Sequence, residues 1–243
     1  MDTAQPAATA PDPQNGRLSW FTRISYGLGD TAMNIVAGAM TILTFFYTDY
    51  AGVEPTTVGL VFLISRIFDG VSDLIMGFIV ERTNSKWGKS RPWILWSSIP
   101  FCVSIVLIYT VPQGSDFMKF VYLFITYNFC NTICYTALNL PYGSLSAMMT
   151  RISRERDMLS ITRMALSPIG KIISISATLP LIKVLGDNQA AWIKVMSIWA
   201  VLAFILLMLC FTQCKEPVGS KARKKVSKFP VVKSLKCLFG NKY

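Results

Sequence analysis

The chain has 243 residues, of which 52% are hydrophobic, and its mean hydropathy is +0.45. A soluble domain of this length has a more balanced composition, so these values favour a membrane protein. The formal net charge of +11 raises nucleic-acid binding as a second class, but the sequence contains no His. Without His, and without an evident nucleophile–base pair or metal cluster, we do not expect an enzyme.

Long apolar blocks follow one another along the chain at 20–47, 56–80, 93–111, 117–148, 159–185 and 191–211. Each is about as long as the ~20 residues that a helix needs to cross the hydrocarbon core. A backbone in lipid must satisfy its own hydrogen bonds, which predicts helices. The predicted fold class is therefore an all-α membrane protein with a bundle of six transmembrane helices over residues 17–214.

The positive charges are distributed unevenly. Most Lys and Arg residues lie just before the first helix, in the loops 82–91 and 151–156, and after Cys214. This asymmetry matches the positive-inside rule and predicts a plasma membrane protein with both termini in the cytoplasm. This distribution also explains the positive net charge without nucleic-acid binding.

The two ends of the chain differ from the bundle in composition. Residues 1–16 are polar, rich in Pro and Ala, and lack a positive charge, so we expect a disordered cytoplasmic tail rather than a signal peptide. Residues 215–243 are basic and predict a cytoplasmic linker that can lie against anionic membrane lipid. The stop at Tyr243, without a closing element, is unusual for a complete protein.

Ionised residues inside the predicted helices are the strongest indication of function. Each costs about 2.5–3.5 kcal/mol near the middle of a membrane helix, so such residues should face the bundle interior or a water-filled cavity. Three acids and three bases can pair with one another. They are Asp30, Arg66, Asp69, Asp73, Arg163 and Lys171.

The first helix carries a polar stripe, because Tyr26, Asp30 and Asn34 recur every four residues. Hydrogen bonds between helices explain such a stripe without a ligand. The acid favours the alternative, in which the stripe binds substrate.

The second helix places Arg66, Asp69 and Asp73 on one face, at spacings of three and four residues. Two carboxylates one turn apart repel unless a cation or a proton lies between them. With Ser72 nearby they resemble half of an oxygen cage for a small hard cation, which predicts a coupling-ion or proton site. The alternative is a structural network in which Arg66 neutralises Asp69.

The fourth and fifth helices also carry polar faces. In the fifth, Arg163 and Lys171 attract an anionic group or pair with the acids of the first two helices, and we favour pairing. Pro141 is expected to kink or open the fourth helix. The polar residues of the fourth helix suit a polyhydroxylated ligand and helix packing equally well. They are Asn128, Thr132, Tyr135, Thr136 and Asn139.

The loop after the second helix is rich in charge. Glu81, Arg82 and Lys89, together with Arg66, are candidate gating residues that hold helix ends in one state and release them in another. Positive-inside topology alone explains the bases, but not the placement of Glu81.

Taken in order, these motifs resemble the glycoside–pentoside–hexuronide:cation symporters of the major facilitator superfamily. The resemblance runs from about Leu18 to the C-terminus and covers the amino-terminal half of a twelve-helix family. The motifs are Tyr26-Gly-Leu-Gly-Asp30, Phe45-Phe-Tyr-Thr-Asp49, Arg66-Ile-Phe-Asp69, Asp73-Leu-Ile-Met-Gly77, Ser85-Lys-Trp-Gly-Lys89, Arg91-Pro-Trp93 and Asn139-Leu-Pro-Tyr-Gly-Ser-Leu145.

The resemblance implies roles for individual residues. The acids that match Asp69 and Asp73 bind the cation in the melibiose-permease branch, and they would be metal ligands if the ion is Na⁺. Ser72 stands where that branch has Asn, and Thr136 matches its threonine ligand. The sugar-binding acid and arginine match Asp30 and Arg163, while Asn139 replaces a second sugar-binding acid.

The predicted function is cation- or proton-coupled uptake of a glycoside, pentoside or hexuronide, with no cofactor other than the coupling Na⁺ or H⁺. The polarity of the helices repeats after the third, as a 3+3 inverted repeat requires. Alternating access needs a second six-helix half, covalent or separate. The alternative is a truncated or partner-dependent membrane protein without independent transport activity.

Overall fold

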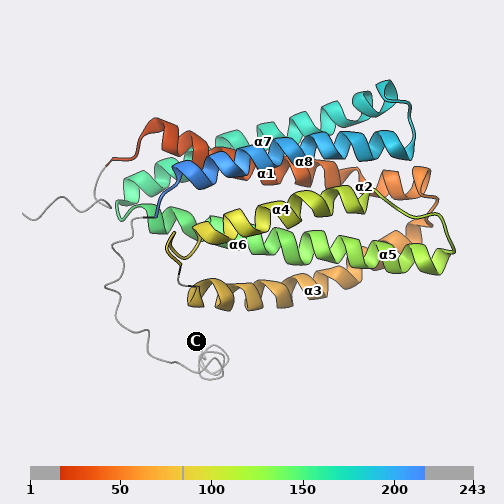
Figure 1. The fold of residues 1–243 in the computed structure, drawn as a ribbon, viewed down its shortest axis with the longest axis horizontal. Coiled ribbons are helices and arrows are strands. Elements are labelled where there is room, and N and C mark those ends of the chain that lie inside the picture. The colour runs from red at the N-terminus through yellow and green to blue at the C-terminus, as the bar shows by residue number, and fades with distance from the viewer. Residues whose placement is uncertain (1–16, 84, 217–243) are drawn as a thin grey trace, which may run out of the picture.

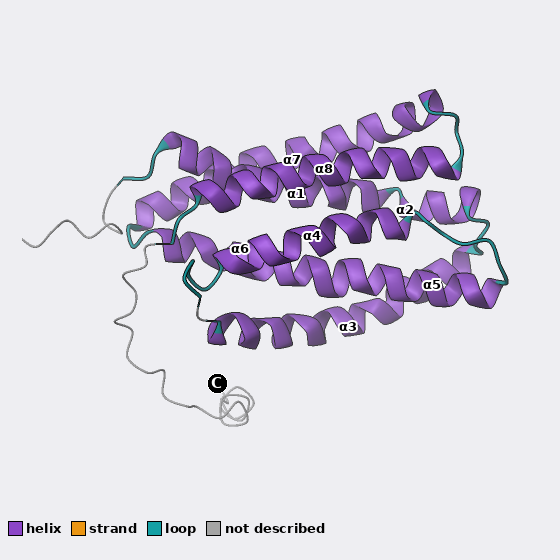
Figure 2. Ribbon diagram, viewed as in Figure 1, coloured by secondary structure: helices purple, strands orange, loops and turns teal. Residues whose placement is uncertain are grey.

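The structure is a computed structural model that describes residues 17–83 and 85–216. Its described part is a bundle of long, roughly aligned helices (Figure 1), and those residues include no strand (Figure 2). The predicted tail 1–16 and the linker beyond residue 216 lie outside the described residues. The elements are α1 (Trp20–Thr41), α2 (Leu43–Phe45), η1 (Phe46–Tyr50), α3 (Pro55–Arg82), α4 (Arg91–Ile108), α5 (Asp116–Asn128), η2 (Phe129–Tyr135), α6 (Thr136–Met149), α7 (Ser153–Val184) and α8 (Gln189–Gln213).

These elements form the six spans that the apolar blocks predict, since α1–α2–η1 and α5–η2–α6 are each one continuous passage (Figure 1). By length and composition, the segments 20–50, 91–108, 153–184 and 189–213 are apolar enough to cross a membrane. The two remaining spans, 55–82 and 116–149, carry the densest polar residues of the candidate site. The bundle is an all-α membrane fold, as predicted.

Local signals explain where the helices begin. The Ser19 hydroxyl accepts a hydrogen bond from the Phe21 amide at 3.3 Å, and the Asn188 side chain accepts one from the Ala191 amide at 2.8 Å. Pro55 occupies the first turn of α3, where its missing N–H costs nothing. Gly186, with a φ of +110°, makes the turn from α7 to α8.

The packing order relates the two triplets of spans. The first span packs on the fifth and sixth (α7 and α8), and the fourth packs on the second and third (α3 and α4); α4 and α8 then meet. Exchanging the first three spans with the last three leaves this pattern unchanged, as a 3+3 repeat requires. This packing order leaves α3 and α7 at opposite edges of the bundle (Figure 1).

Close backbone contact joins α1 to α7. A Cβ added to Gly38 would lie 2.9 Å from the Lys171 carbonyl oxygen, and one added to Gly170 would lie 2.6 Å from the Thr31 methyl group. Small residues at such crossings let membrane helices pack directly. The Ser174 hydroxyl donates to the Ile35 carbonyl at 2.8 Å across the same contact.

Pro141 does not open the fourth span, because α6 runs unbroken from Thr136 to Met149. A proline removes the donor for the carbonyl four residues earlier. That carbonyl belongs to Ala137, and the Ser97 hydroxyl of α4 donates to it at 3.2 Å. The irregular segment lies one turn earlier instead, in the π-helix η2.

Candidate functional site

The first acid of α3 is held by the fourth span. The Thr132 hydroxyl donates to Asp69 Oδ1 at 2.6 Å, and the Asn131 amide donates to both carboxylate oxygens at 3.2 and 3.0 Å. Arg66 contributes only a long contact of 4.0 Å, and its side chain is 77% exposed against 20% for Asp69. The α3 charge is therefore positioned mainly by neutral donors, so Arg66 remains available for another partner.

The second acid lies one turn further along α3. Thr136 donates to Asp73 Oδ1 at 3.1 Å, while the Asp73 side chain is otherwise exposed. Ser72 does not point its hydroxyl at either acid, because that hydroxyl donates to the Thr132 carbonyl at 2.5 Å. Each acid thus has a threonine of the fourth span as its partner, and Ser72 fixes the distance between the two spans.

Asn131 was missed by the sequence analysis, although it makes two of the hydrogen bonds to Asp69. The residues that bind the acids, Asn131 and Thr132, lie within η2, and Thr136 follows it directly. A π-helix has a wider turn than an α-helix, and such turns are frequent at functional sites. An α-helical projection therefore misjudges which side chains face α3. The signal available in the sequence was the amide side chain of Asn131 itself, three residues after Asn128.

The acid of α1 pairs with the arginine of α7, as predicted. Arg163 Nε lies 3.6 Å from Asp30 Oδ2, and the two side chains are 38% and 11% exposed. The guanidinium also lies 5.8 Å from the centre of the Tyr142 ring. Asn34 donates to the Asp30 backbone oxygen at 3.0 Å and more weakly to its carboxylate at 3.4 Å. This ion pair is open on the arginine side, where a ligand could compete for it.

Tyr26 has a supporting place in this cluster. Its ring stacks on Tyr142 with centroids 4.7 Å apart, and the Tyr142 hydroxyl donates to the Tyr26 carbonyl at 2.5 Å. Tyr26 is only 2% exposed, so in this conformation it shapes the floor beneath Arg163 without reaching solvent. Tyr142, which entered the sequence analysis only as part of the motif Asn139–Leu145, supplies the surface of that floor.

The two clusters are neighbours. Tyr142 of the fourth span lies beneath Arg163, and Thr136 of the same span donates to Asp73, so one span contacts both clusters. Asn139 lies between these two residues in the sequence, is half-buried, and its side chain makes no hydrogen bond within the described residues. Its amide is therefore available to a ligand.

Lys171 does not follow the pairing that we favoured. It is exposed on α7 and forms no ion pair among the residues that the structure describes, whereas Arg163 pairs with Asp30. Arg66 and Lys171 thus leave a positive charge exposed on each of the two edge helices.

The candidate gating loop is tied to the end of α8 by a residue that the sequence analysis placed in the linker. Glu216 is only 7% exposed and accepts three backbone hydrogen bonds at 2.8 Å, from the amides of Lys89, Ser90 and Arg91. These amides form the start of α4, where a carboxylate is stabilised by the helix dipole. Glu216 therefore caps α4 from a position 125–127 residues away.

Gly88 is required by this arrangement for two reasons. Its φ of +111° disfavours any side chain, and an added Cβ would lie 2.1 Å from Glu216 Oε2. On the same side, Arg91 donates to the Phe211 carbonyl at 2.6 Å and lies over the Phe211 ring. The loop between the second and third spans is thus fastened to the sixth.

The predicted gating residues differ in their contacts. Lys89 Nζ donates to the Glu81 backbone oxygen at 3.4 Å, which closes the loop on itself. The side chains of Glu81 and Arg82 are exposed, with no side-chain hydrogen bond or ion pair in the described chain. The structure therefore brings Lys89 and Glu81 together but leaves Arg82 apart.

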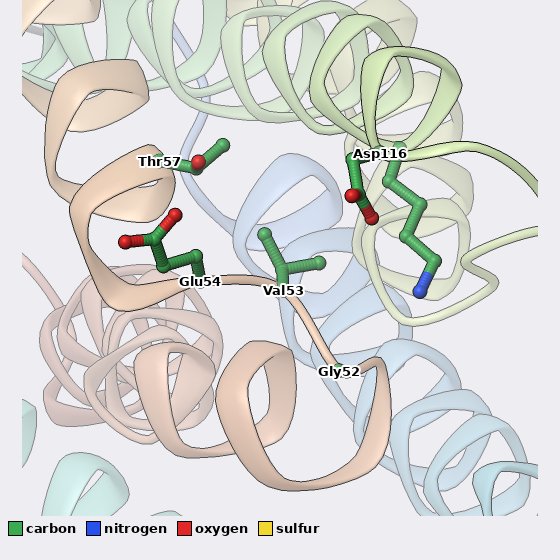
Figure 3. A pocket seen from close by; sticks show the side chains of 6 residues that line it. Gly52, Val53, Glu54, Thr57 and Asp116 are labelled. Atoms are coloured by element: carbon green, nitrogen blue, oxygen red, sulfur yellow. The ribbon is translucent and has the colours of Figure 1, made fainter.

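A small hollow of about 170 Å³ opens at the opposite end of the bundle (Figure 3). Glu54 and Thr57 of the start of α3 face Asp116 of α5 across it, and the Lys119 ammonium, which also lines it, donates to the Ala51 carbonyl at 2.8 Å. It contains none of the predicted site residues, so it is separate from the two clusters.

Comparison with known proteins places the chain among sugar transport proteins. A family model described as MFS/sugar transport protein matches residues 25–243. The chain is 36% identical to the isoprimeverose transporter of Lactiplantibacillus pentosus over 92% of its own length and 47% of the relative's. It is 36% identical to the putative glycoside/cation symporter YagG of Escherichia coli (strain K12), over 93% and 49%. With the glucuronide carrier protein homolog of the same organism, identity is 33% over 84% and 45%. The chain spans about half the length of the curated relatives it matches.

Proposed function

Because this chain belongs to the MFS/sugar transport protein family, we propose that it forms the amino-terminal six-helix half of a sugar symporter coupled to Na⁺ or H⁺. The relatives are named as transporters of isoprimeverose, glucuronide and glycosides with cations. The substrate class proposed for this chain is accordingly a small glycoside, pentoside or hexuronide. No cofactor other than the coupling ion is proposed.

The observation that carries the proposal is the pair of carboxylates on α3. Asp69 and Asp73 are one turn apart near the middle of the span, and their hydrogen-bond partners from the fourth span are neutral donors. Two such charges at close range favour binding of a cation or a proton between them. The hydroxyl and carboxylate oxygens supply the ligand type that a hard cation such as Na⁺ prefers.

The neighbouring Asp30–Arg163 pair supplies the proposed sugar site. A carboxylate and a guanidinium offer acceptors and donors to sugar hydroxyls, and the Tyr142 ring beneath Arg163 offers an apolar surface. Asn34 lies on the same span as Asp30, and Asn139 lies on the same span as Tyr142, so the side chains of both would extend this set. Neutralisation of the α3 acids would be transmitted here through the fourth span, which contacts Asp73 through Thr136 and Arg163 through Tyr142.

A second six-helix bundle, covalent or separate, is proposed to cover the exposed faces of α3 and α7. Large apolar side chains line both helices, among them Ile67, Leu74 and Ile172. Arg66 and Lys171 interrupt these faces near mid-span, and a charge facing hydrocarbon there costs about 2.5–3.5 kcal/mol. A water-lined pathway between two bundles removes that cost, and rocking of the bundles would give alternating access.

The proposed orientation places the basic end of the bundle in the cytoplasm of a bacterial cell. The start of α1, the loop residues 85–90 and 150–152 and the end of α8 all lie at one end (Figure 1). Both termini of the chain would then be cytoplasmic, in agreement with the positive-inside rule.

Uptake of labelled glycosides by cells that express the complete carrier tests the coupling site. Asp69→Asn and Asp73→Asn remove one charge each with little change in shape and should abolish the stimulation of uptake by Na⁺ or by low external pH. Asp49→Asn changes an acid that accepts a hydrogen bond from the adjacent Thr48; it is the matched control and should retain the stimulation. Unchanged cation dependence in both site variants would contradict the proposal.

A further inference from the structure

A second, larger hollow lies outside the two clusters, at the basic end of the bundle. It has a volume of about 570 Å³ and opens between the start of α1 and the start of α7, which lie side by side (Figure 1). The proposed transport mechanism uses none of its residues. The residues that line the hollow include Arg17, Trp20, Arg23, Arg154, Glu155 and Met158.

A buried ion pair forms the base of this hollow. Arg23 donates to both oxygens of Glu155 at 3.1 and 2.8 Å, and the Leu18 amide adds a third hydrogen bond at 3.2 Å. Arg23 and Glu155 are only 8% and 5% exposed. Three of the about four acceptor sites of the carboxylate are therefore already used, which leaves little capacity for further positive charge.

Arg23 itself is not saturated. Its Nε is buried and has no hydrogen-bond partner among the residues that the structure describes. A buried N–H without an acceptor costs about 1–3 kcal/mol. Arg23 lines the hollow, so a shift of its side chain toward an acceptor seated there would give this N–H a partner and remove that cost.

The remaining charges of the hollow are positive. Arg17 and Arg154 are exposed, and neither forms an ion pair within the described part of the chain. Three guanidinium groups thus face a single carboxylate. The positive ends of the α1 and α7 dipoles point the same way. The hollow therefore selects an anion with several acceptor oxygens.

Apolar side chains beside the hollow indicate where that anion comes from. Trp20 is 64% exposed, Phe21 next to it is 58% exposed, and Met158 lines the opposite wall. Tryptophan and its neighbours favour the boundary between headgroups and acyl chains. A soluble anion would gain nothing from these surfaces, whereas the glycerol and acyl chains of a lipid would cover them.

We propose that this hollow binds the phosphate of an anionic phospholipid, with Arg17, Arg23 and Arg154 as its ligands and Trp20 against the glycerol region. The group bound is a phosphate ester, and in this proposal it belongs to a lipid headgroup. The site would anchor α1 to α7 at the membrane surface and make the carrier sensitive to the anionic lipid content of its membrane.

Native mass spectrometry of the purified chain, titrated with phosphatidylglycerol and with phosphatidylcholine, tests this proposal. Removal of one basic residue near an anionic surface weakens binding about fivefold, so the double variant Arg17→Gln/Arg154→Gln should bind phosphatidylglycerol on the order of 20-fold more weakly. The control Arg82→Gln/Lys86→Gln removes the same charge from exposed positions in another loop and should bind as the unaltered chain does. Circular dichroism verifies that both variants retain their helices.

Three outcomes would overturn the proposal. An equal loss in the control would show attraction to general surface charge and no site. Equal binding of phosphatidylcholine would show that the anionic headgroup is irrelevant. Displacement of phosphatidylglycerol by millimolar inorganic phosphate would assign the hollow to a soluble anion.

Discussion

The capping of α4 by Glu216 gives a prediction whose size can be worked from the structure. Glu216→Ala removes three hydrogen bonds of 2.8 Å to a charged acceptor. Ser90 is fully buried, so its amide would be left without a partner, at a cost of about 1–3 kcal/mol. Water can reach the amides of Lys89 and Arg91, which lowers their share. We expect local opening of this helix start to become easier by about 3 kcal/mol.

Hydrogen–deuterium exchange of the 83–93 segment measures that change directly. A loss of about 3 kcal/mol corresponds to exchange that is on the order of 100-fold faster at Lys89, Ser90 and Arg91. Gly88→Ala should produce the same pattern with Glu216 intact, because the new Cβ would occupy the place of the carboxylate. Glu81→Ala, on an exposed side chain of the same loop, is the control. Unchanged exchange in Glu216→Ala would refute the capping argument.

Two further predictions concern the site and the α1–α7 contact. Thr132→Val removes the 2.6 Å hydrogen bond to Asp69 and should raise the cation concentration for half-maximal uptake about tenfold, from a contribution of about 1.5 kcal/mol; an unchanged value would mean that Thr132 does not position the acid. Gly38→Ala places a methyl group 2.9 Å from the Lys171 carbonyl and should cost about 1–3 kcal/mol, seen as a lower unfolding temperature in detergent. Gly59→Ala, with nothing within 4 Å, should be neutral or slightly stabilising, and equal effects would contradict the close contact.

Hydropathy alone predicts the spans well, because the free energy of placing a helix in lipid depends on composition over about 20 residues. The block 56–80 became α3 at Pro55–Arg82, and 191–211 became α8 at Gln189–Gln213. The partnership of Asp30 with Arg163 was among the expected pairings. For the spans each helix supplies its own signal, and for the ion pair opposite charges inside a membrane bundle attract one another.

Contacts between distant and individually unremarkable residues could not be predicted. Glu155 and Glu216 lie at the ends of helices, outside the apolar blocks, and their partners are 132 and 125–127 residues away. A carboxylate at such a position looks like an ordinary solvated charge. Asn131 was hidden for another reason, since η2 alters the angle between successive side chains. Lys171 was expected to find an acid, but α7 turns it toward the edge of the bundle.

The wide turn η2 has a consequence for how the fourth span can change by mutation. An α-helix advances 100° per residue, so a single inserted residue rotates everything beyond it by more than a quarter of a circle unless a wide turn absorbs it. The segment 129–135 is such a wide turn. The side chains within it therefore point in other directions than a continuous α-helix would give them. The wide turn sets the direction in which Thr132 points, toward Asp69, and the regular helix beyond it sets the direction of Thr136, toward Asp73. Deleting one residue there would restore a regular α-helix and leave Thr136 facing Asp73, but it would turn the side chains of the wide turn itself, Asn131 and Thr132, away from Asp69. The ability of the fourth span to contact both acids at once therefore depends on one extra residue in this turn.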